Sequence, residues 1–137
     1  MTIRDIIESA DDSRNNTIGT QRKIEWLSQL DEQIYDDIIL AHEDHEDYGD
    51  VAFPYTVDTQ VLIAPDRFKE MYETYLMAKI DLQQAENALY SNDSTIHNSA
   101  YADFENWYNA NHLPVQKNRF HVKAQYARRR YDVFANE

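Results

Sequence analysis

Glycine is nearly absent from this chain, and that scarcity limits its possible folds more than any other feature. Only two of the 137 residues are glycine. A Rossmann fold or a P-loop needs closely spaced glycines so that backbone N–H groups can approach phosphate, and neither pattern is present. Turn-rich sheet proteins also rely on glycine in their turns. The sequence therefore predicts a protein built of long helices.

Length and composition predict one globular domain. A content of 42% hydrophobic and 28% charged residues is typical neither of a disordered chain nor of a membrane protein. No apolar run approaches the ~20 residues that span a bilayer, and the N-terminal residues do not resemble a signal peptide. The absence of cysteine excludes disulfide and thiolate chemistry, which suits a reducing cytoplasm.

The net charge of −12 is distributed unevenly along the chain. Residues 24–66 contain twelve acidic residues and no Lys or Arg. Residues 115–137 contain six basic and two acidic residues, a net charge of +4, which leaves −16 on residues 1–114. Nonspecific nucleic-acid binding by the acidic part is disfavoured because such binding depends on cationic contacts with phosphates. The basic segment is either a solvated helix end or a docking element for an acidic protein or a phosphate.

Apolar periodicity predicts the first two helices. Thr2, with Asp5 three residues later, is a candidate N-cap for a helix whose buried face is Ile3, Ile6, Ile7 and Ala10. A second helix starts near Thr20 as its candidate N-cap. The apolar stripe of this second helix is Ile24, Leu27, Leu30, Ile34, Tyr35, Ile38 and Ile39.

Residues 51–63 have a different pattern, rich in β-branched and aromatic side chains and interrupted by Pro54. This composition predicts a short β-hairpin or an extended arm between the second and third long helices. A long helix is then expected from Pro65 to about Tyr90, with an apolar stripe covering half its circumference and hence packed from two sides.

The polar run SNDST at 91–95 is expected to end that helix and to begin another that stops near Asn111. In the C-terminal segment, Phe120, Ala124, Ala127, Tyr131 and Phe134 follow a 4-3-4-3 spacing, which indicates a terminal helix with a narrow apolar seam. The predicted fold is a mainly α small bundle of four to five helices in residues 1–114, followed by a basic docking helix or tail at 115–137.

Two carboxylates fall within the predicted apolar stripes. Asp31 lies in the stripe of the second helix and Glu86 in that of the long helix. Burying an unpaired charge is costly, so each is expected to be a structural hydrogen-bond acceptor, for a helix end or an arginine. The alternative is a general acid–base pair, which would need a substrate cleft between them.

The segment LAHEDHEDYGD contains a candidate metal site. On a helix His42, His45 and Glu46 would share a face and could ligate zinc or a similar ion. The spacing fits neither an EF-hand nor an HExxH motif. The simpler interpretation is a solvated, acidic helix end, whose carboxylates oppose the helix dipole.

Aromatic residues make up 12% of the chain, a high value for a polar helical protein. Tyrosine and tryptophan often anchor protein interfaces, so a homo-oligomer is expected. The interface candidates are Trp26, Tyr72, Tyr75, Trp107 and Tyr108. No serine-hydrolase elbow is present, and we expect neither enzyme activity nor a cofactor.

Three segments carry an extended pattern: KIEWLSQLDEQIYDDIILAHE (23–43), LIAPDRFKEMYETYLMAKIDLQQAENALYSND (62–93) and NSAYADFENWYNANHLP (98–114). Their order and spacing resemble the head-to-tail connector, or adaptor, proteins of long-tailed bacteriophages that infect Gram-positive bacteria. The resemblance covers Lys23 to Pro114. The sequence departs from the family at Ala110, where arginine is common, and many relatives end soon after the position of Pro114.

The resemblance implies a structural subunit in the virion neck, made in the cytoplasm of the bacterial host. A ring of about twelve copies would join the portal protein to a stopper or tail-completion protein. DNA would pass through the ring without specific binding, and no membrane is involved. The carboxylates expected to line the channel are Asp36, Asp37, Glu43, Asp44, Glu46, Asp47 and Asp50. The residues expected to dock on the portal or tail are Lys117, Arg119, Lys123, Arg128, Arg129 and Arg130.

Two other functions fit parts of the sequence. An acidic DNA mimic that inhibits a host DNA-processing protein would use the charge of −16 on residues 1–114. A metal-dependent enzyme would use His42, His45 and Glu46.

Overall fold

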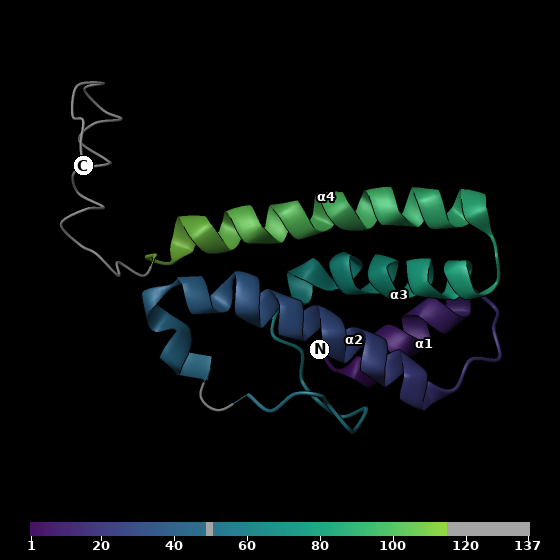
Figure 1. The fold of residues 1–137 in the computed structure, drawn as a ribbon, viewed down its shortest axis with the longest axis horizontal. Coiled ribbons are helices and arrows are strands. Elements are labelled where there is room, and N and C mark those ends of the chain that lie inside the picture. Colours follow the sequence, from purple (N-terminus) through teal and green to yellow (C-terminus); the bar gives the residue numbers. More distant parts are fainter. Residues whose placement is uncertain (49–50, 115–137) are drawn as a thin grey trace, which may run out of the picture.

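The computed structural model describes residues 1–48 and 51–114, and this part of the chain is mainly helical and forms no β-strand (Figure 1). The predicted mainly α fold is confirmed, with four long helices. The terminal helix predicted within 115–137 lies outside the described residues. The α-helices are α1 (Ile3–Ser13), α2 (Thr20–Asp37), α3 (Lys69–Gln83) and α4 (Asn87–Asn111). Short 3-10 helices are η1 (Ile39–Ala41), η2 (Glu43–Tyr48) and η3 (Asp66–Phe68).

The start of α1 is fixed by the capping box expected from its sequence. The Asp5 N–H donates to the Thr2 hydroxyl at 3.3 Å, and the Thr2 N–H donates to the Asp5 carboxylate at 2.9 Å. The predicted cap of α2 is wrong, because Thr20 is already helical and Gly19 occupies the N-cap position without a side-chain bond. Both helices bury the apolar faces that their periodicity predicts.

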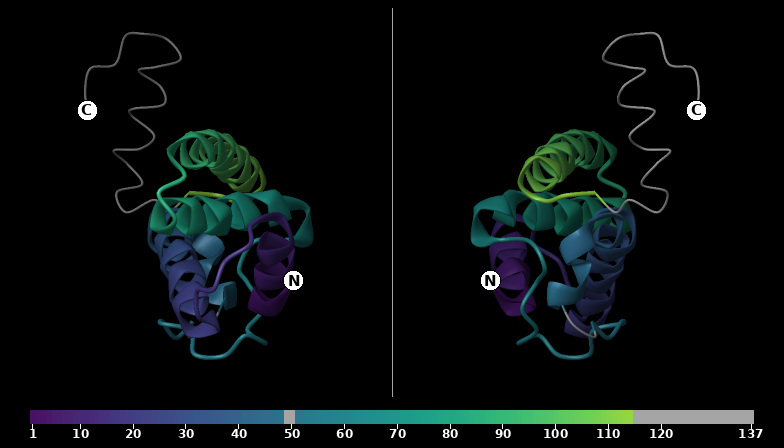
Figure 2. Two further views of the ribbon diagram at one scale, coloured as in Figure 1. Left: turned by 90° about the vertical axis from the view of Figure 1, so that its right-hand side faces the viewer. Right: turned by 90° about the vertical axis from the view of Figure 1, so that its left-hand side faces the viewer.

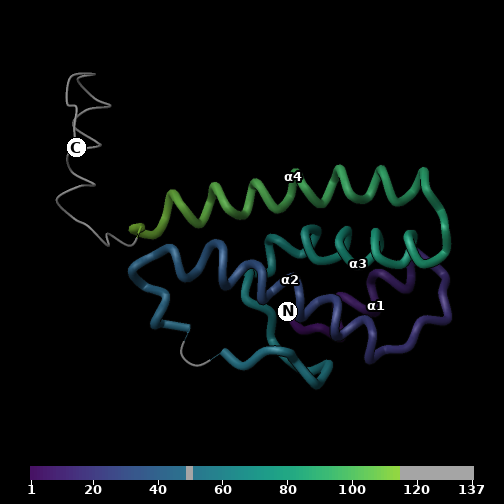
Figure 3. Tube along the Cα trace, in the orientation of Figure 1, coloured from purple at the N-terminus to yellow at the C-terminus, as the bar shows by residue number. Residues whose placement is uncertain are grey.

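Residues 51–64 run as an extended segment against the helices of the same chain, and no hairpin forms. The Ile3 N–H donates to the Gln60 carbonyl at 3.0 Å, and the Leu62 N–H to the Met1 carbonyl at 3.1 Å. Tyr55 is buried within the core. Figure 3 follows this segment along the lower edge of the molecule and up to the start of α3. Of the two predicted alternatives the β-hairpin is therefore wrong, and the segment is extended but packs on its own subunit.

The boundary between α3 and α4 differs from the prediction. The chain leaves α3 through a Schellman turn, in which the Glu86 N–H donates to the Asp81 carbonyl at 2.9 Å and the Ala85 N–H to the Leu82 carbonyl at 3.3 Å. Ala85 has a φ of 58° at the left-handed position of this turn. The predicted break at 91–95 is wrong, since these residues lie inside α4.

Helix α3 forms the middle layer of the molecule. Helix α4 covers one side of α3, and α1 with α2 covers the other (Figures 1 and 2). The fully buried residues of α3 are part of the hydrophobic core: Met71, Tyr72, Leu76 and Ile80. Two-sided packing of this helix was predicted from its wide apolar stripe and is confirmed, but both partners belong to the same chain.

Replacing Ala85 by glycine should stabilise the protein. An alanine at a φ of 58° is strained by about 1 kcal/mol because its Cβ crowds the backbone, and glycine has no such contact. Urea denaturation should show a higher midpoint with an unchanged slope. The control is Ala88→Gly in the first turn of α4, which should be destabilising. A lower midpoint for Ala85→Gly would contradict the interpretation.

Candidate functional site

Asp31 organises a buried polar centre in the middle of α2. Its carboxylate is fully buried and accepts hydrogen bonds from the Tyr72 hydroxyl at 2.5 Å, the Tyr55 hydroxyl at 2.7 Å and the Ile63 N–H at 3.1 Å. The Tyr72 hydroxyl accepts in turn from the Ala64 N–H at 3.0 Å. The carboxylate is thus a hydrogen-bond acceptor, as predicted. Its donors are two tyrosines and the backbone of an extended segment, whereas a helix end or an arginine was expected.

The pKa of Asp31 makes stability depend on pH. Burial raises this pKa from 3.8 to about 6, against the three hydrogen bonds that lower it. The native state therefore binds more protons than the unfolded state between pH 4 and pH 6, and the cost of the buried charge is present above pH 6. We expect the free energy of unfolding to fall by about 3 kcal/mol as the pH rises from 4 to 7, from this group alone. For Asp31→Asn, denaturation measured at several pH values across this range should show a free energy of unfolding that changes less with pH.

Glu86 does not share this environment. It lies exposed at the N-cap position of α4 and makes no side-chain bond to the helix end. Glu86 was predicted to lie in an apolar stripe because one continuous helix was expected to run to Tyr90. The turn at 84–86 interrupts that helix, so the predicted stripe does not include Glu86. Asp31 is therefore buried in α2, whereas Glu86 is exposed at the start of α4. The two carboxylates do not form an acid–base pair.

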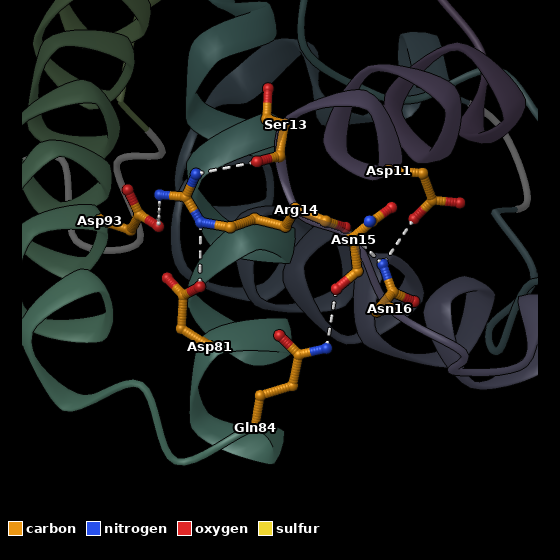
Figure 4. A network of polar contacts seen from close by, with 8 residues as sticks. All are labelled: Asp11, Ser13, Arg14, Asn15, Asn16, Asp81, Gln84 and Asp93. Atoms are coloured by element: carbon orange, nitrogen blue, oxygen red, sulfur yellow. Dashed lines mark hydrogen bonds and ion pairs between the residues drawn. The ribbon is translucent and has the colours of Figure 1, made fainter.

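A second buried polar centre joins three helices and was not predicted (Figure 4). Arg14, just after α1, donates from Nε to Asp81 at 3.0 Å and from Nη2 to Asp93 at 2.9 Å. Both aspartates are buried, in α3 and α4 respectively. Burial and, after it, the neighbouring Asp93 raise the pKa of Asp81 to about 6, although Arg14 opposes both. One guanidinium thus neutralises two carboxylates in part, and it ties the end of α1 to the α3–α4 hairpin.

The proposed metal ligands His42, His45 and Glu46 do not converge. His42 has an extended backbone before the turn, and residues 43–48 form a 3-10 helix kinked at Asp44, so the three side chains do not lie along one face of an α-helix. Each histidine uses Nδ1 to contact a backbone carbonyl, His42 that of Ile38 at 2.6 Å and His45 that of His42 at 2.9 Å. Within the described residues no group of three potential ligands is arranged to hold a metal ion.

The buried ring of His42 belongs instead to an aromatic cluster at the end of α4. It meets Tyr108 edge-on at 4.7 Å, and Tyr108 stacks on His112 with centroids 3.7 Å apart. His112 also makes a short contact through Nδ1 with the Asp44 carboxylate. Burial opposes ionisation of Asp44, but the hydrogen bond and charge of His112 outweigh it and lower the pKa of this carboxyl. The cluster fastens the acidic turn η2 to α4.

The acidic stretch and the last described residues, Leu113 and Pro114, therefore meet at one end of the helical body (Figure 1). The Glu43 N–H donates to the Leu113 carbonyl at 2.8 Å, and His42 forms an isolated antiparallel bridge with Pro114. The exposed carboxylates at this end are Asp36, Asp37, Glu43, Glu46 and Asp47, with Asp44 half-buried. Asp50 and the six basic docking candidates, Lys117, Arg119, Lys123, Arg128, Arg129 and Arg130, lie outside the described residues.

The interface candidates divide into two groups. Tyr72 and Tyr108 are fully buried in the core of their own chain, so they offer no surface to a partner. Trp26, Tyr75 and Trp107 are half-buried at the edge of the core. The high aromatic content is thus explained largely by internal packing, and only these three remain as interface candidates.

No family model, curated protein or solved structure matches this chain. None of the helices within 1–48 and 51–114 is long and apolar enough to cross a bilayer.

Proposed function

We propose that this chain is a structural subunit of a phage neck, assembled as a ring between the portal and the tail. The proposal starts from the resemblance of residues 23–114 to connector proteins. The three segments that carry it correspond to α2 with η1, to α3 with the start of α4, and to the rest of α4. The pattern therefore spans three of the four α-helices that build the core.

The observation that carries the proposal is the group of exposed carboxylates at the end of the body where the described chain stops at Pro114. Exposed carboxylates of α2 and η2 lie beside Leu113 and Pro114, from which the basic segment 115–137 continues. Around a channel, repeated carboxylates repel phosphates and let DNA slide without sticking. The basic segment supplies the complementary charge for an acidic surface on the portal or a tail protein.

Quantitative mass spectrometry of purified virions tests the proposal. A copy number close to that of the portal protein supports a ring adaptor. Absence from the particle, combined with inhibition of a host nuclease or repair protein, would instead establish the DNA-mimic function. The local group of exposed acids at one end, Asp36, Asp37, Glu43, Glu46 and Asp47, fits a charged band around a channel, which is why we propose the adaptor first.

Neutralising the acidic end should slow DNA passage without preventing ring formation. The variant replaces Asp36 and Asp37 by Asn, Glu46 by Gln and Asp47 by Asn, all exposed positions. We expect slower DNA release from assembled particles, most clearly at low salt, where charges act over about 10 Å or more. The control replaces Glu8 and Asp12, which are exposed on α1. An unchanged release rate, or a ring with the acidic end outward, would contradict a channel lining.

A further inference from the structure

The buried centre around Arg14 contains one oxygen atom whose hydrogen bonding is incomplete (Figure 4). Asp81 is fully buried in α3, and its Oδ1 accepts from the Arg14 Nε at 3.0 Å. Its Oδ2 is buried as well, yet no group in the described part of the chain donates to this atom. Leaving a buried carboxylate oxygen without a donor is costly, so this oxygen calls for an explanation.

The carboxyl group of Asp93, in α4, is the polar neighbour that can supply one. Asp93 is only 2% exposed, and it accepts from the Arg14 Nη2 at 2.9 Å. It raises the pKa of Asp81 through a hydrogen bond as well as through its charge. Two ionised carboxylates offer acceptors alone and cannot hydrogen-bond to each other. The contact between the two groups is therefore a hydrogen bond only when one of them carries a proton.

The charges of the centre lead to the same conclusion. One guanidinium faces two carboxylates, so the centre has a net charge of −1 when both acids are ionised. Two like charges held together away from water repel each other, and one of the two groups then tends to keep its proton. A proton on the Asp81 Oδ2 makes the centre neutral and gives Asp93 a donor. It also removes the unsatisfied oxygen.

The other charged groups near the end of α1 do not supply a second cation. Lys23 of α2 binds Asp11 of α1 at 2.8 Å. Gln84, in the turn after α3, is neutral and donates to the Asn15 carbonyl at 2.8 Å. Among the described residues, ion pairs join Asp81 and Asp93 to Arg14 and to no other cation. Neutrality of the centre therefore depends on a proton.

We propose that Asp81 and Asp93 share one proton, and that this proton controls how firmly the end of α1 is fastened to the α3–α4 hairpin. When the proton is bound, the two carboxyl groups are joined and Arg14 holds both of them. When it is lost, the acids repel each other across the hairpin. The arrangement is thus a pH-sensitive latch made of Arg14, Asp81 and Asp93.

The latch closes as the pH falls. Burial and the neighbouring Asp93 raise the pKa of Asp81 from 3.8 to about 6 in the native state. The closed latch therefore binds more protons than an opened one between pH 4 and pH 6, and the cost of the second buried charge is fully present above pH 6. The latch is firm at pH 5 and weaker at pH 7.

The segment that the latch holds is the link between α1 and α2. The Arg14 N–H closes the last turn of α1 on the Ala10 carbonyl at 2.8 Å, and the Ile18 N–H donates to the Asn16 side chain at 3.1 Å. Opening of the latch should expose these amides while the Asp31 centre stays packed. This device concerns a single chain, so it does not depend on the neck proposal, and failure of either leaves the other unaffected.

A carbon-13 NMR titration of the natural protein tests the shared proton directly. The side-chain carboxyl resonances of Asp81 and Asp93 should shift together between pH 5 and pH 7, because the proton belongs to the pair. The exposed carboxyl of Asp103, on α4, is the internal control and should already be ionised at pH 5. Resonances of Asp81 and Asp93 that show two ionised groups throughout this range would overturn the proposal.

Hydrogen exchange tests the control of the latch. Asparagine at position 81 can accept from Arg14 and donate to Asp93 without titrating, so Asp81→Asn should keep the latch closed. Between pH 5 and pH 7, protection of the Arg14 and Ile18 amides should fall about ten-fold more in the natural protein than in Asp81→Asn. Asp31 is unchanged in both proteins, so its titration cancels in this comparison. Asp103→Asn is the control and should behave like the natural protein. An equal fall in Asp81→Asn would overturn the latch.

Discussion

Replacing Asp31 by alanine should lower the free energy of unfolding by about 3–5 kcal/mol, a large part of the stability of a single domain. The change removes the acceptor for the hydroxyls of Tyr55 and Tyr72 and for the Ile63 N–H. All three donors would lose their acceptor, and a buried donor left without a partner costs about 1–3 kcal/mol. The extended segment 51–64 should then detach from α2 and α3.

Urea denaturation at pH 7 measures the loss, and hydrogen exchange locates it. The amides of Tyr55, Ile63 and Ala64 should exchange fastest relative to the natural protein. Asp31→Asn keeps one acceptor oxygen and should lose roughly half as much or less. The matched control is Glu32→Ala, one residue along α2 and exposed, which should change stability by about 0.5 kcal/mol at most. Similar values for Asp31→Ala and Glu32→Ala would refute the role of this carboxylate.

The sequence predicted the elements whose signals are local. The period of α1 and α2 and the capping box at Thr2 depend on side chains a few residues apart, and the structure follows them. The turn after α3 has no such signal, because its left-handed position is occupied by Ala85 in place of a glycine or asparagine. The polar residues at 91–95 were expected to end a helix, but four of the five are wholly or partly exposed on α4, where they compete little with helical hydrogen bonds.

The buried centres show the same limit at longer range. The role of Asp31 as a buried acceptor was predictable, because a carboxylate inside an apolar stripe must find hydrogen-bond donors. The identity of those donors was not, because it depends on where the segment 51–64 packs. The contact of Arg14 with Asp81 and Asp93 required the correct α3–α4 turn, so the sequence alone offered no signal for it. The alternative of a metal site at His42, His45 and Glu46 assumed one continuous α-helix, whereas His42 is extended and residues 43–48 form a kinked 3-10 helix.

Replacing Arg14 by alanine should also cost about 3–5 kcal/mol, because it leaves two buried carboxylates facing each other without a cation. Burial and the neighbouring Asp93 already raise the pKa of Asp81. Without the guanidinium this pKa should rise further, so the variant should recover stability on acidification from pH 7 to pH 5 more strongly than the natural protein does. Denaturation at the two pH values measures both effects.

Two further variants separate the electrostatic role of Arg14 from simple loss of packing. Asp81→Asn combined with Arg14→Ala removes one of the two opposed charges, so the double variant should be more stable at pH 7 than Arg14→Ala alone. Arg14→Lys keeps the charge but not the planar group that reaches both carboxylates, and should fall between the natural protein and alanine. Arg22→Ala, an exposed arginine over Trp26, is the control and should lose only about 0.5 kcal/mol. If Asp81→Asn gives no rescue, the destabilisation comes from lost packing, and the structure does not depend on one cation held between two buried acids.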